Sequence, residues 1–92
     1  MYLEIVSPEA TLFAGEVKSV TVPGINGEFQ MLQGHAPVVS LLQEGKVKVE
    51  GTITLEEEHE DKFTKDASGK TILAISSGTI ELKDNKLIVL AD

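Results

Sequence analysis

The sequence predicts an all-β fold, an antiparallel β-sandwich or barrel built from about ten short strands. Its dominant hydrophobic period is two, because polar and apolar residues alternate in 46–49, 52–55 and 79–83. Such alternation turns one face of a strand toward water and the other toward a core. Turn-forming residues interrupt the chain every several positions, and the β-branched residues between them suit a pleated surface. No segment shows a helical period of useful length.

The first half of the chain contains five expected strands, each an apolar or alternating run. They cover residues 2–6, 11–13, 16–22, 27–32 and 37–42. Each run ends at a pair of residues typical of turns, in order Ser7-Pro8, Ala14-Gly15, Pro23-Gly24, Gln33-Gly34 and Glu44-Gly45.

The second half contains five more expected strands, at residues 45–50, 52–56, 71–76, 79–83 and 86–90. The last two form the clearest hairpin, because Asp84 and Asn85 both tolerate the positive φ angles of a tight two-residue turn. Residues 56–70 are the least regular part. The carboxylates of 56–61 repel one another at this density, so we expect a solvated hairpin end here rather than core.

Composition limits the chain to a few functional classes. Its 92 residues fit one domain, 1–92, and 15 acids against 8 lysines give a net charge of −7. This balance, with no arginine, does not suit wrapping a nucleic acid backbone. There is no cysteine, no apolar run near the roughly 20 residues of a membrane span, and no signal-peptide pattern at the start. We therefore expect a soluble protein with no direct membrane insertion.

The residues that usually perform catalysis do not form a recognisable motif. No serine lies in a Gly-x-Ser-x-Gly elbow, and only His35 and His59 could act as imidazole bases. The glycines never form a phosphate-binding loop that leads into a helix. We expect no catalytic residue, no nucleotide and no cofactor.

Two local patterns could nevertheless indicate a site. His59 lies among acids, but Zn²⁺ would require more than one imidazole and Ca²⁺ a fixed cage of oxygens, so a charged solvated tip is the favoured interpretation. Lys62 follows Glu60 and Asp61, and lipoyl and biotinyl carrier domains are small acidic sandwiches that present a lysine between acids at a hairpin tip. An ordinary surface lysine is favoured, because no apolar strands closely frame a two-residue turn here. A carrier domain modified at Lys62 remains the alternative function.

Residues 27–39 are the most informative stretch. Gly34 permits a tight backbone, Pro37 fixes φ, and the polar Glu28 and His35 are expected near a loop end of the fold. A turn stabilised by a histidine hydrogen bond and a binding surface at the end of a rigid sheet both explain this pattern. Periodicity does not choose between them.

Several short motifs follow one another along the chain. They are Val6-Ser7-Pro8-Glu9, Leu12-Phe13-Ala14-Gly15, Gly27-Glu28-Phe29, Gly34-His35-Ala36-Pro37, Leu42-x-x-Gly45, Ile75-Ser76-Ser77-Gly78 and Val89-Leu90-Ala91-Asp92. In this order and at nearly this spacing, they resemble the N-terminal domain of the epsilon subunit of bacterial F-type ATP synthase. The resemblance covers roughly 70 of the 92 positions.

The chain departs from the family pattern at several positions. Gln30, Gln33 and Ser77 stand where the family usually has Gly, Pro and Gly, and residues 51–70 are longer and more acidic than usual. Many members continue into a regulatory two-helix hairpin, whereas this chain ends at Asp92. The regulatory properties of that hairpin are therefore not carried over.

The resemblance implies a flattened ten-stranded β-sandwich in the central stalk of the ATP synthase. Such a subunit is not catalytic: it binds the gamma subunit and the polar loops of the c ring, contacts the alpha and beta subunits indirectly, and passes torque from proton translocation. It lies peripherally at the cytoplasmic face of the bacterial inner membrane. Glu28 matches the family's contact with the c-ring loops, which commonly carry Arg. A carboxylate that faces a guanidinium forms a specific, charge-assisted contact. Ser7, His35 and Pro37 match positions near gamma and the ring.

Overall fold

The computed structural model describes residues 1–92 and contains ten strands and one short 3₁₀ turn. The strands are β1 (Tyr2–Val6), β2 (Thr11–Glu16), β3 (Ser19–Gly24), β4 (Gly27–Leu32), β5 (Val38–Leu42), β6 (Gly45–Glu50), β7 (Phe63–Lys65), β8 (Thr71–Ile75), β9 (Gly78–Lys83) and β10 (Lys86–Ala91), and the 3₁₀ turn η1 (Glu60–Lys62) precedes β7. No helix in the structure has the length and apolar character that crossing a bilayer requires.

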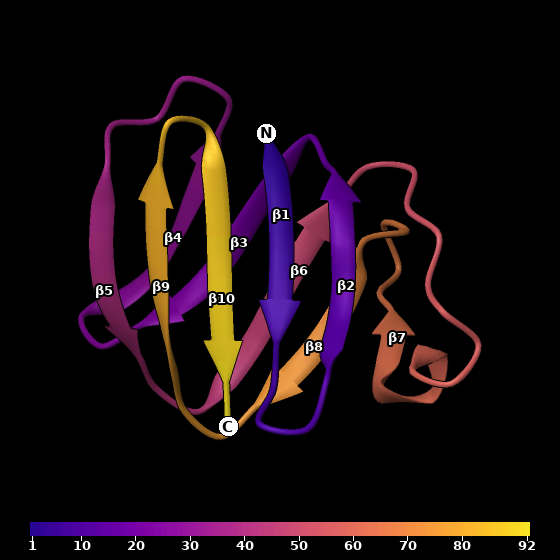
Figure 1. Ribbon diagram of the computed structural model, residues 1–92. Helices are drawn as coiled ribbons and strands as arrows, with labels where there is room; N and C mark the ends of the chain where they lie inside the picture. The colour runs from indigo at the N-terminus through magenta and orange to yellow at the C-terminus, as the bar shows by residue number, and fades with distance from the viewer.

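All strands belong to one hydrogen-bonded sheet that folds over on itself. Its order is β2-β1-β10-β9-β5-β3-β6-β8-β7, and β4 pairs with the other edge of β3. The link between β5 and β3 is a single residue pair, Gly24 with Leu42. The sheet folds at this link into a front layer, β2-β1-β10-β9-β5, and a back layer, β4-β3-β6-β8-β7, whose strands cross behind the front layer (Figure 1).

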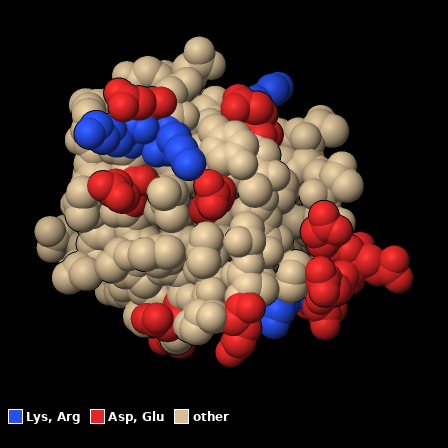
Figure 2. Space-filling view, viewed as in Figure 1, with Lys and Arg blue, Asp and Glu red and all other residues tan.

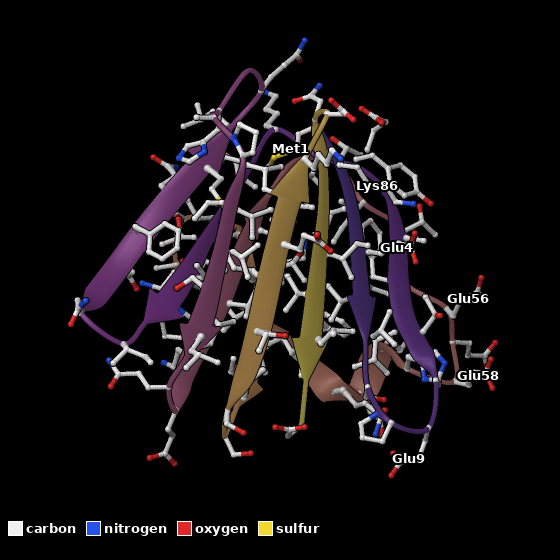
Figure 3. The ribbon with its side chains drawn as sticks, turned by 60° about the vertical axis from the view of Figure 1, so that its left-hand side comes forward. Met1, Glu4, Glu9, Glu56, Glu58 and Lys86 are labelled. Atoms are coloured by element: carbon white, nitrogen blue, oxygen red, sulfur yellow. The ribbon has the colours of Figure 1, made fainter.

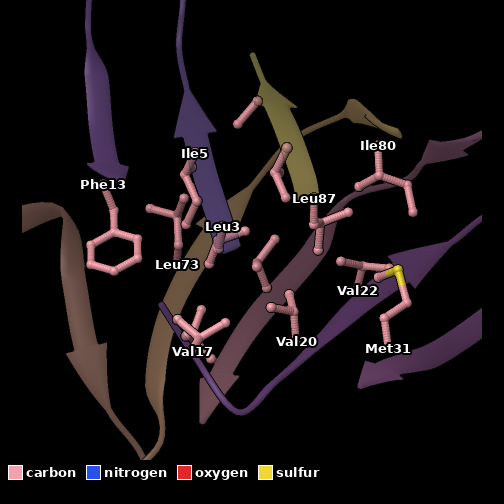
Figure 4. Close-up of a cluster of buried hydrophobic side chains, with 14 of the residues drawn as sticks. Leu3, Ile5, Phe13, Val17, Val20, Val22, Met31, Leu73, Ile80 and Leu87 are labelled. Carbon is pink, nitrogen blue, oxygen red and sulfur yellow. The ribbon is translucent and has the colours of Figure 1, made fainter. Parts of the chain in front are cut away.

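The core lies between these two layers. Twenty buried hydrophobic residues form one cluster, and both layers contribute to it, as Leu3 and Leu87 in front and Val20 and Val22 behind illustrate (Figure 4). The alternation seen in the sequence explains the packing. On β6 and β9, the inward positions are apolar and buried while their neighbours are polar. The sequence prediction of an all-β sandwich is confirmed.

One pair of neighbouring strands departs from the expected antiparallel arrangement. β1 runs parallel to β10, with Tyr2 opposite Lys86 and Val6 opposite Leu90. The two strands come from opposite ends of the chain, so no short turn dictates their direction, and no local sequence pattern could reveal the pairing. The β9–β10 hairpin forms as predicted, with φ angles of 51° at Asp84 and 62° at Asn85.

The prediction of a strand at residues 52–56 is wrong. This segment has no strand pairing, although Ile53 and Leu55 do pack against the core from it. Instead, β7 occupies the free edge of β8, with Phe63 opposite Leu73. Phe63 is buried, so part of the expected solvated stretch 56–70 contributes to the core. The physical reason is competition for edges: β3 and β8 flank β6, and β7 covers β8, so residues 52–56 cannot pair with β6 or with β8.

The boundary between the second and third expected strands also moves. Gly15 and Glu16, read as a turn and the start of the next strand, both belong to β2 and pair with β1. Pro23 and Gly24, also read as a turn, end β3 instead. The true turn is Ile25-Asn26, and Pro23 is tolerated because it contributes its carbonyl, which accepts a hydrogen bond from Gln43 N at 2.9 Å.

Surface charge is unevenly distributed. Acidic side chains gather on the side of the molecule where the loop before β7 lies (Figure 2). From that loop, Glu56 and Glu58 extend away from the protein, whereas Glu4 and Lys86 lie together on the front layer (Figure 3). The latter pair is an ion pair with 3.2 Å between Glu4 Oε1 and Lys86 Nζ. The acidic loop is therefore solvated, as expected for its carboxylates.

Candidate functional site

Glu28 occupies an exposed edge of the back layer. It is the second residue of β4, opposite Pro23 on β3. Its carboxylate Oε2 lies 3.1 Å from Nζ of Lys48, which extends from β6 on the other side of β3. The Glu28 side chain is 53% exposed, so an approaching group can still reach the carboxylate.

The local sequence fixes this position through two glycines at the β3–β4 turn. Gly27 has φ of +123°, a conformation that side chains rarely allow. Gly24 lies against the Phe29 ring, and a Cβ added there would approach Phe29 Cε1 to 2.7 Å. Larger residues would thus displace the turn, and with it Glu28.

A shallow groove of about 540 Å³ lies beside Glu28, between β4 and β5. Neither strand pairs with the other, so the sandwich is open along this side. The groove is lined by the β3–β4 turn, by the start of β4 and by the middle of β5, and its apolar side chains are Ile25, Phe29, Val39 and Leu41. The structure therefore places the carboxylate next to accessible apolar side chains.

The outer surface of the front layer continues this apolar character. Val39, Leu41 and Leu90 are 76%, 59% and 50% exposed. Leu41 and Leu90 both lie opposite Thr79, and Leu90 lies opposite Val6, so these side chains share one face across four strands. We call Val39, Leu41 and Leu90 the apolar face. Exposed apolar residues grouped in this way are typical of an interaction surface.

The outer surface of the back layer is different, because polar side chains bond to one another across it. Gln30 Nε2 donates to Ser19 Oγ at 3.3 Å, and Ser19 Oγ donates to Glu50 Oε1 at 3.1 Å. With the Glu28–Lys48 pair, this network spans β4, β3 and β6. The two outer surfaces of the sandwich thus suit different kinds of contact.

His35 and Pro37 lie in the exposed loop between β4 and β5. Asn85 Oδ1, from the β9–β10 turn, accepts a hydrogen bond from Gly34 N at 3.2 Å and holds this loop in place. His35 Nδ1 donates to the Ala36 carbonyl at 2.6 Å, which leaves Nε2 as the ring nitrogen available to a partner. The histidine hydrogen bond offered by the sequence is thus observed, and the binding surface stays a prediction.

Ser7 lies at a different place, in the turn between β1 and β2. Its Oγ donates to the Ala10 carbonyl at 3.2 Å, so the hydroxyl serves the turn. The His35 loop is held near the start of β1, where Asn85 O accepts a hydrogen bond from Tyr2 N at 3.0 Å, whereas Ser7 follows the end of that strand. Glu28, His35 and Ser7 do not converge on one site.

Comparison with known proteins identifies the family. Residues 1–92 match the family described as the β-sandwich domain of the ATP synthase delta/epsilon chain. The chain belongs to this family. The ATP synthase epsilon chain of Chlorobaculum tepidum is 39% identical over 90 residues, covering 98% of this chain and 86% of that protein. The epsilon chain of Campylobacter fetus is 40% identical over 92 residues, covering all of this chain and 60% of that protein.

Solved structures agree on the fold of this delta/epsilon-family chain. A chain in the central stalk and c-ring structure of the Tetrahymena thermophila mitochondrial ATP synthase has a TM-score of 0.74. It is 14% identical, and the match covers 99% of this chain and 62% of that one. At this identity the likeness concerns the β-sandwich itself.

The structure places the remaining candidate residues of this epsilon-type chain, Lys62 and His59, in or beside the short η1 turn. Lys62 ends η1 directly before β7, rather than standing at the tip of a two-residue hairpin. His59 Nε2 lies 3.8 Å from Glu58 Oε1, and no group of three potential ligands is close enough to hold a metal ion. Asp66 accepts hydrogen bonds from Ser68 Oγ and from the backbone of Ser68 and Lys70, which lower the pKa of this exposed carboxyl. It stabilises the turn before β8.

Sequence reasoning did not identify the apolar face. A signal was present in residues 38–42, which are apolar at nearly every position, a pattern typical of a strand covered on both sides. In the structure, the side chain of Leu42 is buried while those of Val39 and Leu41 remain uncovered. One face of β5 is therefore buried in the sandwich, and the other presents apolar side chains to solvent.

Proposed function

We propose that the chain is a non-catalytic central-stalk subunit of a rotary ATP synthase. It binds the gamma subunit and the c ring, contacts alpha and beta indirectly, and lies peripherally at the cytoplasmic face of the bacterial inner membrane. The observation that supports this most directly is the pairing of two surfaces in a chain of the delta/epsilon family: the exposed apolar face and the exposed Glu28 carboxylate beside it.

The apolar face suits the gamma subunit. Its three side chains are at least half exposed and would lose contact with water on binding. The strands beneath them, β5, β9 and β10, pair continuously, so the face is rigid. A rigid surface transmits torque without deforming, because closely packed sheets have low compressibility.

Glu28 suits a cationic loop of the c ring. A carboxylate that receives two parallel N–H donors from a guanidinium forms a short, geometrically specific contact. The net charge of −7 accelerates encounter with a basic partner. Proton passage then turns the ring, and the chain passes the rotation to gamma without any reaction of its own. His35, Pro37 and Ser7 are proposed as flanking contacts of these two surfaces.

The test is copurification with gamma, using two variants that make the same change on opposite faces. Leu41→Ser removes an exposed leucine from the apolar face, and Leu32→Ser removes one from the back layer, where it is 52% exposed. The wild type and Leu32→Ser should bind gamma equally, and Leu41→Ser about tenfold more weakly, because it buries less apolar area. Gamma binding that is absent in the wild type, or equal in all three, would contradict the proposal.

A further inference from the structure

The carboxylate proposed to meet the c ring already has a cationic partner. Lys48 Nζ lies 3.1 Å from Glu28 Oε2, and the Lys48 side chain is 32% exposed against 53% for Glu28. Lys46, two positions earlier on β6, forms no ion pair. One of the two lysines on this strand is therefore committed to Glu28, and the other is free in solvent.

The backbone fixes this partnership. Lys48 lies opposite Thr21, and Glu28 lies opposite Pro23, so the two side chains reach toward each other across β3. Thr21–Lys48 is the last pair of the β3–β6 ladder, and Pro23–Glu28 is the second pair from the β3–β4 turn. A slip of either register would turn every side chain of the strand to the other face. The backbone therefore keeps Lys48 within reach of the Glu28 carboxylate in the folded protein.

We propose that Lys48 acts as an internal competitor for the cation that Glu28 receives from its partner. The inference rests on the proposed function of Glu28. An incoming guanidinium must either displace the ammonium from Oε2 or share the carboxylate with it, and in both cases it approaches a like charge. Lys48 thus weakens the contact and makes it depend on the kind of cation that approaches.

Competition of this kind favours arginine over lysine in the partner. A guanidinium can engage both carboxylate oxygens in a fork, whereas a second ammonium only repeats the single contact that Lys48 already makes. Breaking the ion pair costs little free energy, because an exposed ion pair contributes little to stability and the Lys48 ammonium can return to water. The effect on affinity is therefore a few-fold, and the contact stays reversible.

The experiment measures binding of the full chain to the purified c ring in lipid nanodiscs, at low and high salt. Lys48→Gln should bind about threefold more tightly than the wild type at low salt. Lys46→Gln removes the same charge from the same strand and should bind as the wild type does. Lys48→Arg replaces the ammonium by a guanidinium that can engage both carboxylate oxygens, so it should compete more strongly and bind the ring more weakly than the wild type. In a Glu28→Gln background, the substitution Lys48→Gln should no longer change the affinity.

Each outcome decides a distinct point. Weaker binding by Lys48→Gln, or equal binding by Lys48→Gln and Lys46→Gln, overturns the inference while leaving the proposed function intact. If the wild type binds neither the ring nor gamma, the proposed function is wrong, and the inference is wrong with it. Thermal unfolding of every variant accompanies the binding series, so that a misfolded protein is not counted as a weak binder.

Discussion

Asp84 and Asn85 show how far single residues can be interpreted from the sequence. Their tolerance of positive φ predicted the β9–β10 turn, and the observed angles of 51° and 62° confirm it. The second role of Asn85 was not predictable, because its Oδ1 accepts from Gly34, 51 residues away in the sequence. Backbone conformation is a local property, whereas a tertiary hydrogen bond depends on the path of the whole chain.

At the residue scale, we predict the effect of replacing Glu28. Glu28→Ala should weaken binding to the c ring about tenfold, because it removes a charge-assisted contact, while the exposed position leaves the fold intact. Binding can be measured with the nanodisc assay, and folding by thermal unfolding. The matched control is Glu57→Ala, which removes an equal charge from the acidic loop. Equal ring binding by Glu28→Ala and the wild type would refute the assigned contact.

At the scale of elements, residues 51–65 show that an alternating pattern can predict which side chains are buried without predicting which segment pairs as a strand. Alternation in 52–55 correctly indicated that Ile53 and Leu55 face inward, since both pack against the core. It did not indicate that the segment would lack a strand partner. Phe63, the lone aromatic residue in a charged stretch, was the available signal for β7, because a buried aromatic supplies much of the apolar area of a short strand.

Phe63 therefore anchors β7 and the loop before it. Phe63→Ala should destabilise the protein by about 3 kcal/mol, because it leaves a cavity where the ring contacted the core. Chemical denaturation would measure the loss, and hydrogen exchange should show faster opening of β7 before the remaining strands. Thr64→Ala, at the exposed neighbouring position, should change stability by less than about 0.5 kcal/mol. Similar losses in both variants would mean that the ring contributes no specific anchoring.

On the scale of the whole molecule, charge and apolar area are separated. Acids gather around the loop before β7 (Figures 1 and 2), whereas the exposed Val39, Leu41 and Leu90 of the apolar face belong to β5 and β10. Concentrated like charge opposes the compact state through self-repulsion. The acidic loop thus reduces stability, and we assign it no contact with gamma or the ring.

Neutralising this loop should stabilise the fold without changing assembly. Replacing Glu56, Glu57 and Glu60 by Gln is expected to raise the unfolding midpoint at low ionic strength, and the gain should shrink in 1 M salt, where charges are screened beyond roughly 3 Å. The control is a triple Gln replacement at scattered positions, namely Glu9, Glu44 and Glu81. It changes the net charge equally and should raise the unfolding midpoint less. A loss of gamma binding after neutralising the loop would show that it is a contact surface.

The sequence by itself determined the fold class, most strand positions, the final hairpin and the family, because alternation, turn chemistry and motif order are local properties of the chain. Tertiary structure alone decided the parallel pairing of β1 with β10, the replacement of 52–56 by β7 at the edge of β8, and the grouping of Val39, Leu41 and Leu90 on one exposed face. These features depend on which edges and surfaces remain free after distant segments have packed. The pairing of Glu28 with Lys48 belongs to the same class, since two strands on either side of β3 bring them together.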